Sequence, residues 1–279
     1  MKIHWFPGHM TKALRMMQDN VKTCDLIGYV LDARAPLSSL NPAFDNLFQH
    51  KPVLFILNKC DMADDSQTQQ FLQYFKDKNL PCVALSALDG KQIATLKNAL
   101  YQTAKPKLER NKKKGLNIPV RVMIVGVPNC GKSTLINSLA KRKSVATGNT
   151  PGVTRGKQWV QMSNELTLLD TPGTCWSNYE DQTVAQRLCF VGSIKREVFD
   201  VYEVALLLID ELSIKYPKAI ETRYKVQTDG SNEEILAKIC RARGYVLRGD
   251  ELDLERGALT ILDEYQKGKL GKITFDRLQ

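Results

Sequence analysis

The chain has 279 residues, which is enough for one large domain or two ordinary ones with a real hydrophobic core. Its composition, 43% hydrophobic and 25% charged, is that of a soluble globular protein, and no apolar run is long enough to cross a bilayer. The net charge of +10 is uneven, since residues 1–175 carry 24 of the 40 basic but only 12 of the 30 acidic side chains. This charge indicates a polyanionic partner, most simply RNA, with a merely soluble basic protein as the equally open alternative.

The N-terminal segment predicts a cytoplasmic protein. Met1–Trp5 has neither the apolar core of a signal peptide nor the Arg/Ser bias of a transit peptide. The seven cysteines are scattered and form no C-x-x-C pair, so we expect reduced thiols without a zinc site or disulfides. A helix is predicted over Thr11–Val21, after the aromatic segment His4–Met10.

Five apolar runs predict the strands of a doubly wound, mainly parallel α/β sheet. The three longest are Leu26–Leu31, Val53–Leu57 and Val120–Val125, and two shorter ones are Pro81–Leu85 and Leu166–Leu169. Each long run is followed by turn residues and then a helical pattern, as βαβ units require. Ligands of such sheets bind at the carboxyl ends of the strands, and the motifs described below all lie there.

The first of these motifs, Asn58–Asp61 (NKCD), has the N-K-x-D pattern with which GTPases recognise guanine. The Asp61 carboxylate can accept two hydrogen bonds from the N1–H and exocyclic amine of guanine, whereas adenine offers no such pair. The aliphatic part of Lys59 can cover the base. Ser86 and Ala87 resemble the loop whose backbone amide contacts guanine O6.

A basic linker, residues 104–119, separates this part of the chain from the next strand. Its stretch Ala104–Gly115 holds six cations and one glutamate, together with Pro106. We expect a solvated tether here, with an arm that contacts phosphates as the alternative.

The P-loop is Gly126–Ser133 (GVPNCGKS), which matches G-x(4)-G-K-S between a strand and a helical segment. Its glycines let backbone N–H groups face the β-phosphate. Lys132 contacts the β- and γ-phosphates, and the Ser133 hydroxyl ligates Mg²⁺. Asn129 resembles the asparagine of potassium-dependent GTPases, which helps to hold K⁺ beside the phosphates, but a loop-stabilising role is equally open.

Two segments after the P-loop correspond to switches. Asp170–Gly173 (DTPG) is a D-x-x-G motif, in which Asp170 would hold Mg²⁺ through water and the Gly173 amide would sense the γ-phosphate. Between the P-loop and this motif, we expect the Thr154 hydroxyl to meet Mg²⁺ and the γ-phosphate, with Thr150 as the alternative.

The residue that activates the attacking water is harder to assign. Many GTPases have a glutamine after D-x-x-G, but this chain has Thr174, which is too short for that role. His9 is the candidate, because the permuted order described next brings the N-terminal segment close to the γ-phosphate. The alternative for His9 is a structural residue before the helix.

The guanine motif precedes the P-loop, whereas ordinary small GTPases have the opposite order. We therefore predict a circularly permuted P-loop GTPase domain over residues 1–177. Residues 178–279 predict a small, mostly helical domain. A capping box opens a helix at Ser231–Glu234 that stops at Gly244, and a second helix ends near Gly268.

The chain as a whole resembles the circularly permuted ribosome biogenesis GTPase A family. The resemblance rests on the nucleotide motifs, on His4–Met10 (HWFPGHM) and Leu31–Pro36 (LDARAP), and on Asp253–Arg256 with Gly268–Gly271. It implies GTP hydrolysis stimulated by the ribosomal particle, a C-terminal domain that contacts ribosomal RNA, and a catalytic His9. Thr174 departs from the family, which has a hydrophobic residue there.

Our leading hypothesis is a GTPase that binds GTP and GDP and the pre-50S particle with its rRNA, uses Mg²⁺, and is a monomer away from the ribosome. The alternatives are an RNA-binding scaffold with little hydrolysis, and a GTPase of tRNA modification or ion transport, for which a modifying domain or membrane span is missing. The predicted nucleotide contacts are Asn58, Lys59, Cys60, Asp61, Ser86, Ala87, Asn129, Cys130, Gly131, Lys132, Ser133, Thr134 and Gly173; the magnesium ligands are Ser133, Thr154 and Asp170; the catalytic residues are His9, Lys132 and Thr154.

Overall fold

The computed structural model describes residues 8–140, 145, 158–176 and 179–278. The strands are β1 (Leu26–Asp32), β2 (Val53–Asn58), β3 (Cys82–Leu85), β4 (Val120–Val125), β5 (Gln158–Gln161) and β6 (Leu166–Asp170). The helices are α1 (Gly8–Val21), α2 (Ala43–Leu47), α3 (Asp65–Asp77), α4 (Gly90–Lys113), α5 (Lys132–Ala140), α6 (Gln182–Phe190), α7 (Val201–Lys215), α8 (Pro217–Tyr224), α9 (Asn232–Arg243) and α10 (Leu254–Gln266), with 3-10 turns η1 (Cys60–Met62) and η2 (Arg196–Val198).

The strands form one sheet in the order β3-β2-β1-β4-β6-β5, in which β5 alone pairs antiparallel. Strand β4 pairs with β1 on one side and with β6 on the other, so it connects the strands that precede it in the chain with those that follow it. The predicted mainly parallel, doubly wound sheet is thus confirmed, with the base-reading half of the chain on one side of β4 and the segment of D-x-x-G on the other.

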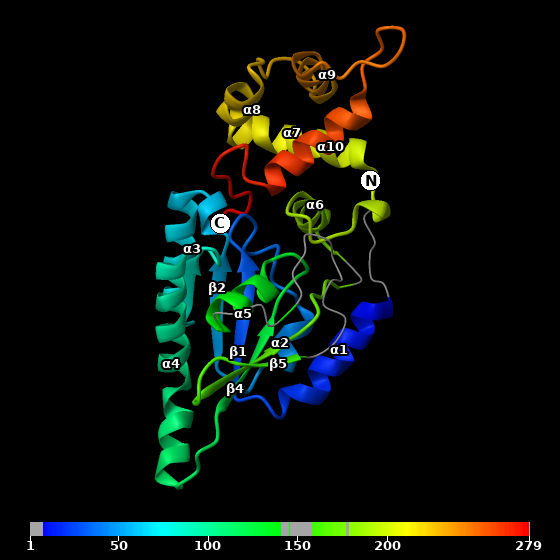
Figure 1. Ribbon diagram of the computed structural model, residues 1–279. Coiled ribbons are helices and arrows are strands. Elements are labelled where there is room, and N and C mark those ends of the chain that lie inside the picture. The colour runs from blue at the N-terminus through cyan, green and yellow to red at the C-terminus, as the bar shows by residue number, and fades with distance from the viewer. Residues whose placement is uncertain (1–7, 141–144, 146–157, 177–178, 279) are drawn as a thin grey trace.

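Helices cover both faces of the sheet (Figure 1). Along β1, Leu26 and Val30 point to the face covered by α4 and α5, while Ile27, Tyr29 and Leu31 point to the face covered by α1, α2 and α3. This alternation follows from the two-residue period of a strand. Because both faces are buried, the strand sequences are continuously apolar rather than alternating.

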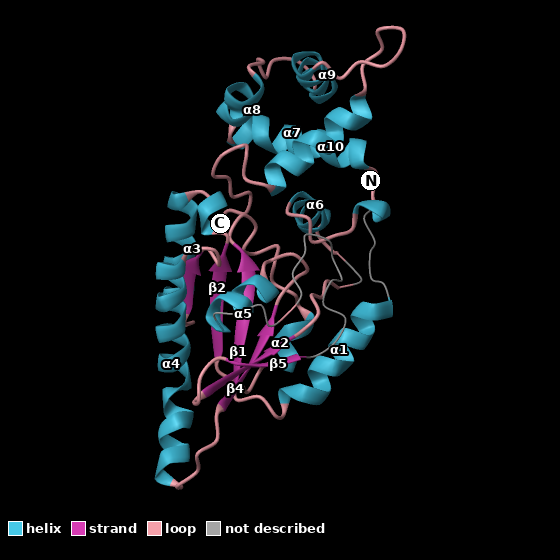
Figure 2. Cartoon of the chain, in the orientation of Figure 1, coloured by secondary structure: helices cyan, strands magenta, loops and turns pink. Residues whose placement is uncertain are grey.

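The helices from α6 onward gather beyond the carboxyl ends of the strands (Figures 1 and 2). Helix α10 packs against α7 and α9, and their buried side chains belong to the same apolar cluster as the α4–α5 face of the sheet. The predicted capping box is present: the Ser231 side chain accepts from Glu234 N, and the Glu234 carboxylate accepts from Ser231 N. Gly244 ends α9 with a φ of 64°, which suits a residue without a Cβ atom.

The predicted tether after Ala104 is wrong in its conformation. Helix α4 continues through it to Lys113, with Pro106 inside the helix. The sequence from Lys107 to Lys113 is rich in leucine, glutamate, arginine and lysine, which favour helix. These residues outweigh one proline, so the connection from β3 to β4 is mostly the helix α4, followed by a short loop over residues 114–119. The far end of α4 projects past the sheet (Figure 1).

The other predicted elements occur close to their expected bounds. Helix α1 starts earlier than predicted, at Gly8, so His9 lies in its first turn. The edge strand β5 was missed, since four residues with exposed glutamines give little strand signal. Among the described residues, no helix is both long and apolar enough to span a membrane.

Candidate GTP-binding site

The motif residues meet at one edge of the sheet. The registers pair Asp32 with Asn58, Asn58 with Leu85, and Ile124 with Asp170. The chain therefore leaves β1, β2, β3 and β6 at nearly the same height, and β4 runs into the P-loop at this same edge. Ligand sites of open parallel sheets form at this position.

The P-loop folds as its two glycines dictate. A Cβ atom on Gly126 would lie 2.2 Å from Val30 O, and one on Gly131 would lie 2.2 Å from Asn58 Nδ2. Both residues also have positive φ values, 151° and 96°. Only glycine meets both conditions.

The buried Lys132 points into the hollow of this loop. Its ammonium group donates to Gly126 O at 3.1 Å and Val127 O at 2.8 Å. A positive charge is thus fixed where the loop can close around a phosphate.

Asn58 ties three predicted contact loops together. It is 1% exposed, its Nδ2 donates to Cys130 O at 2.8 Å, and its Oδ1 accepts from Ala87 N at 2.9 Å. One side chain at the end of β2 therefore sets the spacing between the P-loop and the Ser86-Ala87 loop. Ser138 of α5 adds a hydrogen bond from Oγ to Ala87 O at 2.7 Å.

The base-reading loop leaves Asp61 exposed to solvent, so its carboxylate is open to a ligand. Lys59 has a left-handed backbone with a φ of 65°, and its ammonium donates to Asp32 Oδ2 at 2.8 Å and to Asn129 O. Ser86 N donates to Gln92 Oε1 at 2.6 Å, and Ala87 N to Asn58. A guanine O6 would have to compete with these two acceptors for either amide.

Ser133 and Asp170 form a corner that fits Mg²⁺. The Ser133 hydroxyl donates to Asp170 Oδ2 at 3.0 Å, while Asp170 Oδ1 is buried and has no hydrogen-bond partner among the described residues. Burial raises the pKa of Asp170, an effect that Lys132 and Ser133 offset only in part. A buried carboxylate oxygen without a donor, beside a hydroxyl, is chemically suited to a hard cation.

The D-x-x-G motif lies directly against the P-loop. A Cβ atom on Gly173 would be 2.6 Å from Pro128 Cα and 2.9 Å from the Lys132 ammonium nitrogen. The next residue, Thr174, is fully buried, donates its N–H to Gly126 O at 3.3 Å, and has its carbonyl bound by Asn41. Its hydroxyl accepts from Asn41 Nδ2 at 3.5 Å, so the side chain is enclosed by protein.

The P-loop is also bound by the helical part of the chain. The Asn129 amide donates to Gly192 O at 2.6 Å, and the Ser193 hydroxyl donates to Pro128 O at 2.7 Å. Both partners lie just after α6. The amide nitrogen of Asn129 thus has a structural use, which fits the loop-stabilising role left open for this residue.

Three predicted residues cannot be placed. Thr150 and Thr154 lie outside the described residues, and only the backbone of His9 is described. Cys60 lies within the base-reading loop, and its thiol donates to Gln92 Oε1 at 3.7 Å. Thr134 follows Ser133 in the first turn of α5 and is partly buried.

Two residues that were not predicted as site residues, Asp32 and Arg34, also shape the site. Asp32 is the last residue of β1 and Arg34 lies two residues beyond it, and both are buried to within 1% of full burial. Burial opposes the ionisation of Asp32, but Arg34 and Lys59 together hold its pKa below the ordinary value. An Asp-x-Arg directly after an apolar strand was the available signal.

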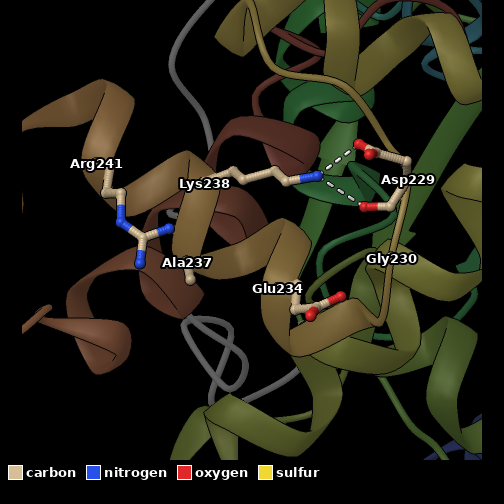
Figure 3. A pocket seen from close by; sticks show the side chains of 6 residues that line it. All are labelled: Asp229, Gly230, Glu234, Ala237, Lys238 and Arg241. Carbon is tan, nitrogen blue, oxygen red and sulfur yellow. Dashed lines mark hydrogen bonds and ion pairs between the residues drawn. The ribbon is translucent and has the colours of Figure 1, made fainter.

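A shallow polar pocket lies elsewhere, at the start of α9 (Figure 3). Lys238 there donates to the carboxylate and the carbonyl oxygen of Asp229, while Arg241 lies apart from that pair. None of the predicted nucleotide residues lines this pocket.

The arrangement defines the class of protein. A P-loop held by the asparagine of an N-K-x-D loop belongs to GTPases, and here the strand bearing the base-reading loop precedes the strand bearing the P-loop. The chain is a circularly permuted P-loop GTPase.

Comparisons with known proteins agree with this class. A family model described as "50S ribosome-binding GTPase" matches residues 121–239. Ribosome biogenesis GTPase A of Bacillus cereus is 40% identical over 278 residues, covering 99% of this chain and 94% of the relative. That of Thermotoga maritima is 31% identical over 274 residues, with 98% and 94% covered.

Two solved structures of YlqF are similar over nearly the whole chain. One, described as GDP-bound, has a TM-score of 0.70 at 26% identity and covers 94% of this chain and 98% of its own. The other, GNP-bound YlqF from T. maritima, has a TM-score of 0.67 at 27% identity, with 95% and 98% covered. The chain belongs to the ribosome biogenesis GTPase A family, and it is a GTP hydrolase of ribosome biogenesis.

Proposed function

We propose that this GTPase binds the pre-50S particle in the cytoplasm and couples GTP hydrolysis to a late step of large-subunit assembly. The description of the matched family model as 50S ribosome-binding supports this choice of subunit. The uneven positive charge supports an RNA partner. Away from the ribosome the protein would be a monomer.

The geometry of the site supports nucleotide binding at the predicted residues. Lys132 and the backbone amides of the P-loop would hold the β- and γ-phosphates, and Asp61 would select guanine. Ser133 and Asp170 would hold Mg²⁺, which neutralises charge on the phosphates when bound. The remaining predicted contacts, at Cys60, the Ser86-Ala87 loop and Thr134, line the same edge of the sheet.

Hydrolysis needs a group that orients water, and the burial of Thr174 leaves this role to another residue. We keep His9 for it, because α1 begins at Gly8 and the neighbouring Met10 is buried in the same apolar cluster as Val127 and Cys130 of the P-loop. Thr154 would complete the magnesium site. Asn129 would be the P-loop residue that contacts K⁺.

The coupling is supported by two hydrogen bonds between the P-loop and the segment after α6. The Ser193 hydroxyl donates to Pro128 O, and the Asn129 side chain donates to Gly192 O. Gly173 packs against the same loop. In this permuted chain the residues after Gly173 lead straight into those helices. Loss of the γ-phosphate contact at Gly173 would therefore move the start of the helical region directly, releasing it from pre-ribosomal RNA.

Two basic surfaces suit contact with ribosomal RNA. At the far end of α4, Arg110, Lys113 and Lys114 are exposed and have no ion pair among the described residues. On α9, Arg241 is exposed, whereas Lys238 pairs with Asp229 and the neighbouring Arg243 pairs with Glu264. The end of α4 therefore offers more unpaired charge to phosphates than the α9 surface does.

The test is GTP turnover by the purified protein alone, with 50S subunits, with pre-50S particles and with 30S subunits. Stimulation by 50S or pre-50S particles but not by 30S would support the proposal, and H9A should then abolish the stimulated rate. Stimulation by 30S alone, or equal affinity for RNA in the GTP and GDP states, would contradict it.

A further inference from the structure

A short extended segment of the C-terminal region returns to the GTP-binding part of the chain. This return segment, Lys272–Asp276, follows α10 and lies beside the ends of β1 and β2 (Figure 1). Thr274, Phe275 and Asp276 are each no more than 1% exposed. Burial of this kind indicates a built contact rather than a loose tail.

On one side the return segment binds the loop after β1. Phe275 N donates to Arg34 O at 2.9 Å, and the Thr274 hydroxyl donates to Ala33 O at 3.1 Å. The Asp276 carboxylate accepts from Ser38 N at 2.8 Å and from Ser38 Oγ at 2.7 Å. Backbone and side chains thus both take part.

On the other side the return segment binds the residues that directly follow the base-reading motif. Ile273 N donates to Met62 O at 3.0 Å, and Asp64 N donates to the Thr274 hydroxyl at 3.1 Å. Met62 is the immediate neighbour of Asp61, the proposed guanine ligand. A shift of the return segment would therefore move the loop that carries the base contact.

A buried set of charges makes a second connection between the same parts. The Lys59 ammonium and the Arg34 guanidinium both bind Asp32 Oδ2 at 2.8 Å, and Arg34 Nε binds Asp32 Oδ1 at 2.8 Å. The remaining nitrogen of Arg34 donates to Tyr265 O at 3.3 Å and Gln266 O at 3.2 Å, the last carbonyls of α10. Those carbonyls hold partial negative charge, which suits a guanidinium.

Every group in this connection is geometrically constrained. A two-pronged arginine–carboxylate pair fixes orientation as well as distance, and at 1% exposure neither partner can exchange its bonds for water. Lys59 adds a left-handed backbone held by the same carboxylate. The base-reading loop and the end of α10 cannot move independently without breaking one of these bonds.

We infer that Asp32, Arg34 and the return segment position the guanine-reading loop, so that binding of the guanine base and docking of the helical domain strengthen each other. The inference rests on the proposed assignment of Asn58–Asp61 to guanine. It differs from the switch at Gly173, because GDP and GTP share the base and should engage this connection equally. By thermodynamic reciprocity, loosening the return segment must weaken nucleotide binding by the factor with which nucleotide tightens the segment.

The variant T274V removes the hydroxyl shared by Asp64 N and Ala33 O while keeping the side-chain shape. We expect it to weaken GDP and GTP binding by a similar factor of about tenfold, within the usual range of coupling between sites. T274S keeps the hydroxyl and should restore the affinity. T260V is the control, because the Thr260 hydroxyl bonds Arg256 O within α10 and Tyr245 Oη, and both partners belong to the helical region.

Amide hydrogen exchange supplies the reciprocal measurement. In the unmodified protein, saturating GDP and GTP should slow exchange at the Ile273 and Phe275 amides alike, and ADP should not. Wild-type GDP affinity in T274V, or protection by GTP alone, would overturn the inference. A failure of the guanine assignment would look different, since the unmodified protein would then not prefer GDP to ADP.

Discussion

Asn58 offers a direct test of how the site is held together. Replacing it with alanine leaves two backbone groups, Cys130 O and Ala87 N, without their partner, and both residues are at least 95% buried. An unsatisfied buried group costs about 1–3 kcal/mol, so about 2–6 kcal/mol is at stake in the two bonds. If about 2 kcal/mol of this loss reduces the free energy of GDP binding, the affinity for GDP drops about thirtyfold.

The assay pairs a fluorescent GDP titration with urea unfolding of the nucleotide-free protein. Asn111 provides a matched control, because it is also a buried asparagine whose Nδ2 donates to a carbonyl, Ile118 O at 3.2 Å. It lies near the end of α4, away from the motifs (Figure 1). We expect N111A to lose stability but keep its GDP affinity, whereas N58A loses both.

An N58A protein that is destabilised yet binds GDP like the unmodified chain would refute this role of Asn58. Asn58 would then act in folding alone, and the spacing between the two loops would be set elsewhere.

Three further predictions concern other parts of the molecule. D61N should weaken GTP binding at least about a hundredfold and admit xanthosine triphosphate, measured by competition, because one of the two carboxylate acceptors is replaced by an amide donor that suits the O2 of xanthine. Reversing the charge of Arg110, Lys113 and Lys114 should weaken binding to ribosomal RNA and leave the GDP affinity unchanged. The slope of log K for RNA binding against log salt concentration should fall in magnitude by about 2–3. An unchanged slope would contradict the role proposed for α4. Hydrogen bonds from Arg223, with help from Tyr224 and Arg243, lower the pKa of Glu264 to about 2 from 4.5, so its contribution to stability is present above pH 4.5 and lost as the pH falls towards 2. E264Q should therefore unfold more easily in urea by about 2 kcal/mol at neutral pH, and the difference should shrink below pH 4.5.

The sheet and the location of the site were predictable because their causes are local. Continuous apolar runs mark strands buried on both faces, and β4 matches the predicted Val120–Val125. The two P-loop glycines are required by contacts within the site, so a motif already known for that geometry locates it. The capping box of α9 is likewise a local signal that the structure confirms.

What the sequence did not disclose depends on contacts between distant residues. Arg34 meets the end of α10, far along the chain, and no short pattern encodes that pair. The continuation of α4 was missed because Pro106 and a cluster of like charges read as a linker. Its conformation is decided by helix propensity together with packing of buried residues such as Ala104 and Asn111.

The central place of β4 has a consequence for synthesis of this protein on the ribosome. The strands that carry the base-reading loop leave the exit tunnel first, but β1 must wait for β4 before its second edge is covered. The return segment emerges later still, after every nucleotide motif. A nascent chain would thus expose an unpaired strand edge for much of its translation, a period in which chaperones or premature nucleotide could act on it. Circular permutation therefore changes the order in which the strands can pair during synthesis, as well as the path that leads from the switch segment to the helical region.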